Sequence, residues 1–153
     1  MLTIYLDNCC YNRPYDDQSQ LRISLETQAK LQIQDMIRNG DIKLATSYVL
    51  LYENSKNPHE QRKKSILSFV KDNTTVYIDV DRANEVKHKA DEIIATGVKT
   101  ADAHHVACAI LAGCDCFLTT DDRLLKYKTD KLQIIDPIDF IRNWEVQEDD
   151  DHQ

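Results

Sequence analysis

The sequence contains few residues that interrupt regular structure, with three glycines and three prolines among 153 residues. It also lacks an uninterrupted apolar run of about 18 residues, the length that a membrane-spanning helix needs. These absences exclude a collagen-like or linker-rich chain and predict one compact, helix-rich domain without a membrane segment. Because the first apolar run already begins at Leu2, we expect no signal peptide and a cytoplasmic protein.

Motifs of several common enzyme classes are also missing. The sequence has no Walker loop, no glycine-rich nucleotide motif, no serine nucleophile elbow and no HExxH metal motif. Its five cysteines, an odd number, follow no zinc-ligand spacing, so we expect free thiols that act as small apolar residues.

Charge is distributed unevenly along the chain, whose net charge is −7. Five acids lie in 145–153, which leaves −2 on the rest, so we predict a domain over 1–144 and a disordered acidic tail over 145–153. The segment 56–71 has five basic residues against one acid, Lys56, Arg62, Lys63, Lys64 and Lys71 against Glu60. This segment is either a solvated helix face or a contact for the phosphates of RNA, and the sequence leaves both open.

Apolar runs alternate with helical patterns throughout the chain. Strands are predicted at 2–6, 42–46, 75–79, 116–120 and 132–136, and helices at 19–39, 48–55, 59–72, 81–96, 100–113 and 137–144. Such alternation favours a five-stranded parallel sheet covered on both faces, a three-layer α/β/α fold. If the chain winds outward through three strands and then returns beside the first, the strand order is 3-2-1-4-5.

Acids stand where this topology would bring them together. Asp7 ends the first strand and Asp121 the fourth, so both would face the crevice where the strand order reverses. Glu53, late in the helix after the second strand, and Asp102, in the first turn of the helix before the fourth, can reach the same crevice. Each has a plain structural alternative, as a turn residue, a helix cap, a surface acid or a partner of the helix dipole.

Four carboxylates in one crevice would repel one another strongly, and some would hold protons at neutral pH unless a cation were bound. Mg²⁺ or Mn²⁺ suits such an oxygen-rich site. A site of this kind can activate water and stabilise the leaving oxygen of a phosphodiester. The pattern therefore predicts metal-dependent hydrolysis.

Four segments carry a resemblance to a known family: "IYLDN", "ATSYVLLYE", "TADAHHVACAILAGCD" and "CFLTTDDRLL". In this order and at these spacings, the chain resembles the PIN-domain family of metal-dependent ribonucleases, which includes the VapC-like toxins. The resemblance implies a PIN-like fold and a Mg²⁺- or Mn²⁺-dependent endoribonuclease that is the toxin of a toxin–antitoxin pair. It also implies an RNA substrate, an antitoxin protein as partner and a homodimer.

The resemblance carries the family's acids over to Asp7, Glu53, Asp102 and Asp121, as catalytic residues and metal ligands, with Asp122 as an additional ligand. We expect His105, three residues after Asp102, to pack in a supporting polar role, because hard Mg²⁺ prefers oxygen. Thr120 is expected to position the turn that presents Asp121.

The chain departs from the family at its first acid. The usual Asp is followed by Thr or Ser and then Asn, whereas here Asp7 is followed by Asn8 and Cys9, so the supporting hydroxyl is missing. One alternative is therefore a non-catalytic PIN-like module that binds RNA or a protein. Another is a receiver-type switch phosphorylated on Asp79, which the absence of a second acid beside Asp7 disfavours.

Overall fold

The computed structural model describes residues 1–151, in which five strands form one sheet in the order β3-β2-β1-β4-β5. Every neighbouring pair is parallel. The strands are β1 (Thr3–Leu6), β2 (Lys43–Ser47), β3 (Thr74–Ile78), β4 (Cys116–Leu118) and β5 (Gln133–Ile135). The predicted fold class and strand order are confirmed.

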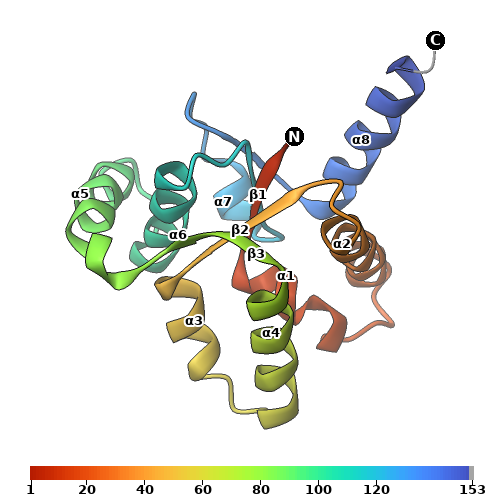
Figure 1. Ribbon diagram of the computed structural model, residues 1–153, viewed down its shortest axis with the longest axis horizontal. Coiled ribbons are helices and arrows are strands. Elements are labelled where there is room, and N and C mark those ends of the chain that lie inside the picture. The colour runs from red at the N-terminus through yellow and green to blue at the C-terminus, as the bar shows by residue number, and fades with distance from the viewer. Residues whose placement is uncertain (152–153) are drawn as a thin grey trace.

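Helices cover both faces of this sheet (Figure 1). The helices are α1 (Asn8–Asn12), α2 (Leu21–Arg38), α3 (Tyr48–Ser55), α4 (Glu60–Asn73), α5 (Ala83–Ile94), α6 (Thr100–Leu111), α7 (Asp122–Leu125) and α8 (Pro137–Asp151), with 3₁₀ turns η1 (Arg13–Tyr15) and η2 (Val80–Arg82). No helix within the described residues is both long and apolar enough to cross a membrane. All five cysteines are free thiols, as expected.

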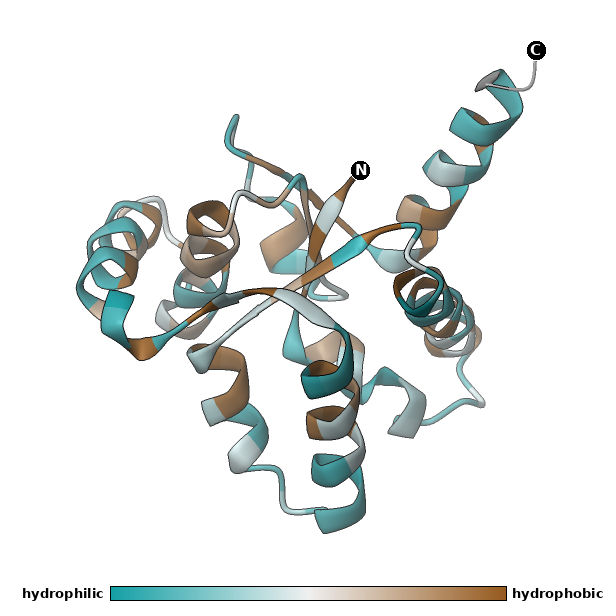
Figure 2. Ribbon diagram, in the orientation of Figure 1, coloured by the Kyte–Doolittle hydropathy of each residue, from teal (hydrophilic) through white to brown (hydrophobic). Residues whose placement is uncertain are grey.

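The alternation of side chains along β1 divides the interior into two cores. Ile4 and Leu6 point into a cluster with α2, α4 and α8, whereas Tyr5 points into a second cluster with α5 and α6. All three side chains are at most 1% exposed, and burying a large apolar side chain contributes roughly 1.5–3 kcal/mol. Figure 2 shows the hydrophobic residues concentrated in the strands and the adjoining helices.

The strand order places the carboxyl ends of β1 and β4 side by side at the centre of the sheet. Leu6 pairs with Leu118, and the next amide, Asp7 N–H, donates to the Leu118 carbonyl at 2.9 Å. Residues that follow these two strands must therefore lie together at the switch point. A receiver-type sheet has the order 2-1-3-4-5 instead, so the topology excludes the phosphoacceptor alternative.

Two segments differ from what the sequence predicted. The polar segment after Asp7, expected as a loop, forms α1 and η1, because the Asp7 carboxylate caps α1 by accepting from the Asn8 amide at 2.8 Å. Helix α8, expected to end at Trp144, continues through 145–151, where a disordered tail was predicted. Its first turns are anchored by the buried Phe140 and Ile141, and extending an established helix requires only one added residue at a time. Residues 152–153 lie outside the described part of the chain.

Candidate active site

Three predicted acids lie near the carboxyl ends of β1 and β4. Asp7 follows β1 directly and is 6% exposed, Asp121 follows β4 after two threonines, and Asp102 stands in the first turn of α6. Burial and, to a smaller extent, the charges of Asp7 and Asp121 together raise the pKa of Asp102 to about 6. The three carboxylates therefore influence one another across separate segments of the chain, as the topology predicted.

Thr119 links two of these acids. Its hydroxyl donates to Asp7 Oδ2 at 2.9 Å and accepts from the Asp121 amide at 3.1 Å, and the side chain is fully buried. The Cys9 thiol lies 3.4 Å from both Asp7 Oδ2 and Thr119 Oγ1. Thr119, directly after β4, thus supplies the hydroxyl that the sequence after Asp7 lacks.

This role of Thr119 corrects the expectation for its neighbour. Thr120 was expected to position the turn before Asp121, but the Asp121 amide binds the hydroxyl of Thr119. Asp121 itself caps α7 by accepting from the Arg123 amide at 2.9 Å. The signal was present in the sequence as the pair "TT" after the fourth strand, and only the register of β4 decides which hydroxyl faces Asp7.

Glu53 joins the site through a row of buried hydrogen bonds. His105 Nε2–H donates to Glu53 Oε2 at 2.9 Å, and the other ring nitrogen lies 2.8 Å from the Tyr5 hydroxyl. Tyr5 in turn contacts the Ser47 hydroxyl at 2.6 Å. These contacts give His105 the supporting polar role expected of it, whereas sequence reasoning missed Tyr5 and did not place Ser47 in this row.

The charge of His105 depends on the acids around it. Burial favours the neutral ring, but the hydrogen bond to Glu53 and the charges of Asp7, Glu53 and Asp102 outweigh it, so the pKa of His105 is raised. A ring that carries two protons would offset part of the negative charge in the crevice. His105 thus binds Glu53 directly, whereas Asp7 and Asp102 act on His105 through their charges.

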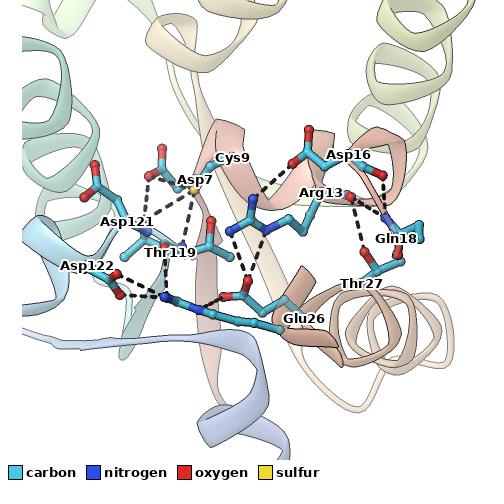
Figure 3. A network of polar contacts seen from close by, with 12 residues as sticks. Asp7, Cys9, Arg13, Asp16, Gln18, Glu26, Thr27, Thr119, Asp121 and Asp122 are labelled. Carbon is cyan, nitrogen blue, oxygen red and sulfur yellow. Dashed lines mark hydrogen bonds and ion pairs between the residues drawn. The ribbon is translucent and has the colours of Figure 1, made fainter. Parts of the chain in front are cut away.

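Asp122 pairs with Arg22, and Figure 3 draws this pair in one network of polar contacts with Asp7, Thr119 and Asp121. Its two oxygens accept from Arg22 at 2.6 and 3.0 Å, and this pairing lowers the pKa of Asp122. Arg22 also lies 3.6 Å from Glu26, a fully buried carboxylate on α2 that binds Arg13 at 3.0 Å. Asp122 is therefore paired with Arg22. Its charge is not among those that shift the pKa of Asp102.

The basic segment 56–71 is only partly available for an external ligand. Arg62 stacks on Tyr15 at 4.6 Å from the ring centroid, and Lys63 pairs with Glu60 at 3.4 Å. Lys64 and Lys71 are exposed on α4. Lys56 is exposed too and lies 4.3 Å from the Tyr52 ring centroid, so the members of the segment that remain candidates for contacts with phosphate groups are Lys56, Lys64 and Lys71.

The acids fit a hard divalent cation in donor chemistry and in charge. Asp7, Asp102 and Asp121 offer carboxylate oxygens, and burial together with the charges of Asp7 and Asp121 raises the pKa of Asp102 to about 6, so a cation nearby would favour its ionised form. Within residues 1–151, no group of three or more Asp, Glu, His or Cys side chains is arranged to hold a metal ion as it stands. Mg²⁺ commonly binds through one or two carboxylates with water completing its shell, so this arrangement remains compatible with it.

Comparisons with known proteins agree with this architecture. Residues 42–130 match the family model described as PIN domain. The chain is similar to a solved structure of FitAB bound to an IR36 DNA fragment, with 17% identity, a TM-score of 0.56, and coverage of 88% of this chain and 95% of that one. It is also similar to the crystal structure of FitAcB from Neisseria gonorrhoeae, with 14% identity, a TM-score of 0.53, and coverage of 88% and 97%. A search among curated proteins finds no match.

A first prediction concerns the hydroxyl that links Asp7 to Asp121. Thr119→Val keeps the shape of the side chain but leaves a buried carboxylate oxygen and an amide without their partner. We expect the free energy of unfolding to fall by about 1–3 kcal/mol, measured by urea denaturation. The matched control is Thr46→Val on β2, whose buried hydroxyl has no partner among the described residues and whose loss should cost nothing. Equal effects of the two substitutions would contradict this role of Thr119.

A second prediction concerns charge crowding at Asp102. Its raised pKa means that the folded protein holds this proton more tightly than the unfolded chain, so stability is lost as the pH rises from about 4 to about 6. In metal-free buffer with a chelator, Asp102→Asn should therefore raise the free energy of unfolding at pH 7.5 by on the order of 1 kcal/mol. The gain should vanish near pH 4, where the wild-type carboxyl is neutral. Asp41→Asn, an exposed acid before β2, should show no such pH-dependent gain.

Proposed function

The chain belongs to the PIN domain family, and from this premise we propose that it is a metal-dependent endoribonuclease that hydrolyses RNA phosphodiester bonds. The observation that supports the proposal is that the charges of Asp7 and Asp121, which come from two other segments of the chain, act on the partly buried Asp102 and contribute to its raised pKa. Perturbed carboxylates that gather at a topological switch point are typical of a functional site. We assign catalytic roles to these three acids and to Glu53.

In this proposal, a divalent ion held by Asp7, Asp102 and Asp121 would make water a stronger nucleophile and neutralise charge on the phosphate. The protein's own residues prepare the site. Thr119 fixes the orientation of the Asp7 carboxylate, and His105 holds Glu53 at the edge of the same crevice. Asp122 is a further ligand only if it leaves Arg22.

Binding of the RNA backbone would fall to basic side chains that are not already paired. Lys64 and Lys71 on α4 meet this condition. Their contacts would be to phosphate and would therefore provide affinity rather than sequence selection. The net charge of the chain does not oppose such binding, because the excess acid is concentrated in 145–151 and in the crevice that would take the cation.

We further propose that the protein is the toxin of a toxin–antitoxin pair, with an antitoxin protein and a second copy of the chain as partners. This part rests on the resemblance to VapC-like toxins. Expression of the wild-type chain alone in bacteria should arrest growth because RNA is cleaved, whereas Asp7→Asn should not. The measurement is colony count after induction, with equal protein levels verified by immunoblot; arrest by both proteins would contradict a toxin acting through cleavage.

One observation favours a second candidate, a PIN-like module that binds RNA without cleaving it. Within the described residues the acids form no ready group of three metal ligands, and Asp7 is already engaged by Thr119 and by the Asn8 amide. The two candidates make different predictions about turnover but the same prediction about binding.

A third prediction separates them. Purified wild-type protein with Mn²⁺ should cleave single-stranded RNA, and Asp7→Asn and Asp102→Asn should each lower the rate at least about 100-fold, the scale of losing one electrostatic group of an active site. Cleavage is measured on a labelled oligonucleotide, with Asp41→Asn as the matched control that should retain full activity. Equal cleavage by wild type and Asp7→Asn would contradict the assignment.

A second readout does not depend on turnover. Because a ligand that binds only the native state stabilises it, millimolar Mg²⁺ should raise the Tm of wild type and of Asp41→Asn more than that of Asp102→Asn. RNA binding by the wild type without cleavage, together with no shift by Mg²⁺ or Mn²⁺, would favour the binding module.

A further inference from the structure

A cavity of about 350 Å³ lies between α2 and α4, and it is separate from the acidic crevice because none of the predicted catalytic acids lines it. Its volume falls within the range of small-molecule sites, about 300–1,000 Å³. The side chains that matter here come from α1, α2 and α4, and are Tyr11, Lys30, Gln34, Arg38, Ser65 and Phe69.

Lys30 is the feature that packing alone does not explain. The residue is 5% exposed, and within residues 1–151 no acid forms an ion pair with its ammonium group, which lies 5.7 Å from the centroid of the Tyr11 ring. Burial and, to a smaller extent, the like charge of Arg38 lower the pKa of Lys30 to about 8. A buried ammonium group is costly unless an anion or hydrogen-bond acceptors compensate it.

Tyr11 brings a second buried polar group to the same cavity. Its ring is packed in the core, yet its hydroxyl has no hydrogen-bond partner among the described residues although the residue is 1% exposed. Leaving a buried hydroxyl unpaired costs about 1–3 kcal/mol, so an isolated case calls for an explanation. Tyr11 from α1, whose hydroxyl has no hydrogen-bond partner among the described residues, and Lys30 from α2, which forms no ion pair within them, therefore line one space.

We propose that this cavity binds a small anionic group, a phosphate or a carboxylate, whose oxygens accept hydrogen bonds from Lys30 and Tyr11. Lys30 can donate three such bonds and Tyr11 one, and neither would give up a hydrogen bond to another described residue. The Arg38 guanidinium adds positive charge at the same wall, where it lies 5.1 Å from the Phe69 ring centroid and pairs with Asp35. Asp72 is the single carboxylate on the lining, so basic groups outnumber acidic ones.

The experiment measures binding by the full chain in the presence of a chelator, so that no divalent ion contributes. The Tm is followed against sodium phosphate, adenosine monophosphate and sodium acetate, with sodium chloride at equal ionic strength as reference. Phosphate, its nucleotide ester or acetate should raise the Tm of wild type above the chloride reference. Whether the two phosphate compounds or acetate bind more tightly decides which anion the cavity takes.

Lys30→Met is the main variant, because it keeps the length of the side chain while removing the unpaired charge. It should fold with stability equal to or above that of wild type and bind the anion at least about tenfold more weakly. Tyr11→Phe should also weaken binding, and Lys43→Met, on the exposed end of β2, should bind as wild type does. Asp102→Asn should bind the anion normally, so this outcome is independent of RNA cleavage.

The proposal is overturned if no anion shifts the Tm of wild type beyond chloride. It is equally overturned if Lys30→Met and wild type respond alike, because binding would then take place elsewhere on the surface.

Discussion

The position of β1 at the centre of a parallel sheet is the constraint from which the rest of this structure follows. Because β1 pairs with β2 on one side and β4 on the other, the ends of segments more than a hundred residues apart become neighbours. The last contact of the β1–β4 ladder, from the Asp7 amide to the Leu118 carbonyl, sets the distance between the first acid and the turn that carries Asp121. Backbone hydrogen bonds therefore determine where the chain positions of Asp7 and Asp121 lie relative to one another.

A site built in this way opposes the stability of the fold that carries it. Asp102 is partly buried near Asp7 and Asp121, and its raised pKa reflects first this burial and then the charges of the other two acids. The two cores on either face of the sheet provide the compensating free energy, since the strand residues are almost completely buried. The three acids are thus tolerated because they lie next to the closely packed strands at the centre of the sheet.

The parts of the molecule that follow from local sequence could be predicted, and those that depend on precise register could not. Strand positions and order follow from apolar periodicity and from chain winding, and they place Asp7, Asp102 and Asp121 at one end of the sheet. Which threonine supports Asp7 depends on the pairing of Leu6 with Leu118, which periodicity does not encode. The attachment of Asp122 to Arg22 joins residues a hundred positions apart through flexible side chains, which no local pattern reports. The continuation of α8 through an acidic segment reflects tertiary anchoring at its start, whereas composition alone favours disorder.

The row from Glu53 to Ser47 has a consequence for how the protein carries charge. When His105 is doubly protonated, its Nδ1–H points at the Tyr5 oxygen, and Tyr5 must then direct its own hydrogen at Ser47. When the ring is neutral with its hydrogen on Nε2, Tyr5 points back at the ring and Ser47 at Tyr5. One proton gained or lost beside the acids therefore reverses the polarity of two successive hydrogen bonds inside the sheet. The reversal extends to Ser47, which caps helix α3, so the protonation state of His105 sets the direction of hydrogen bonds as far as the start of that helix.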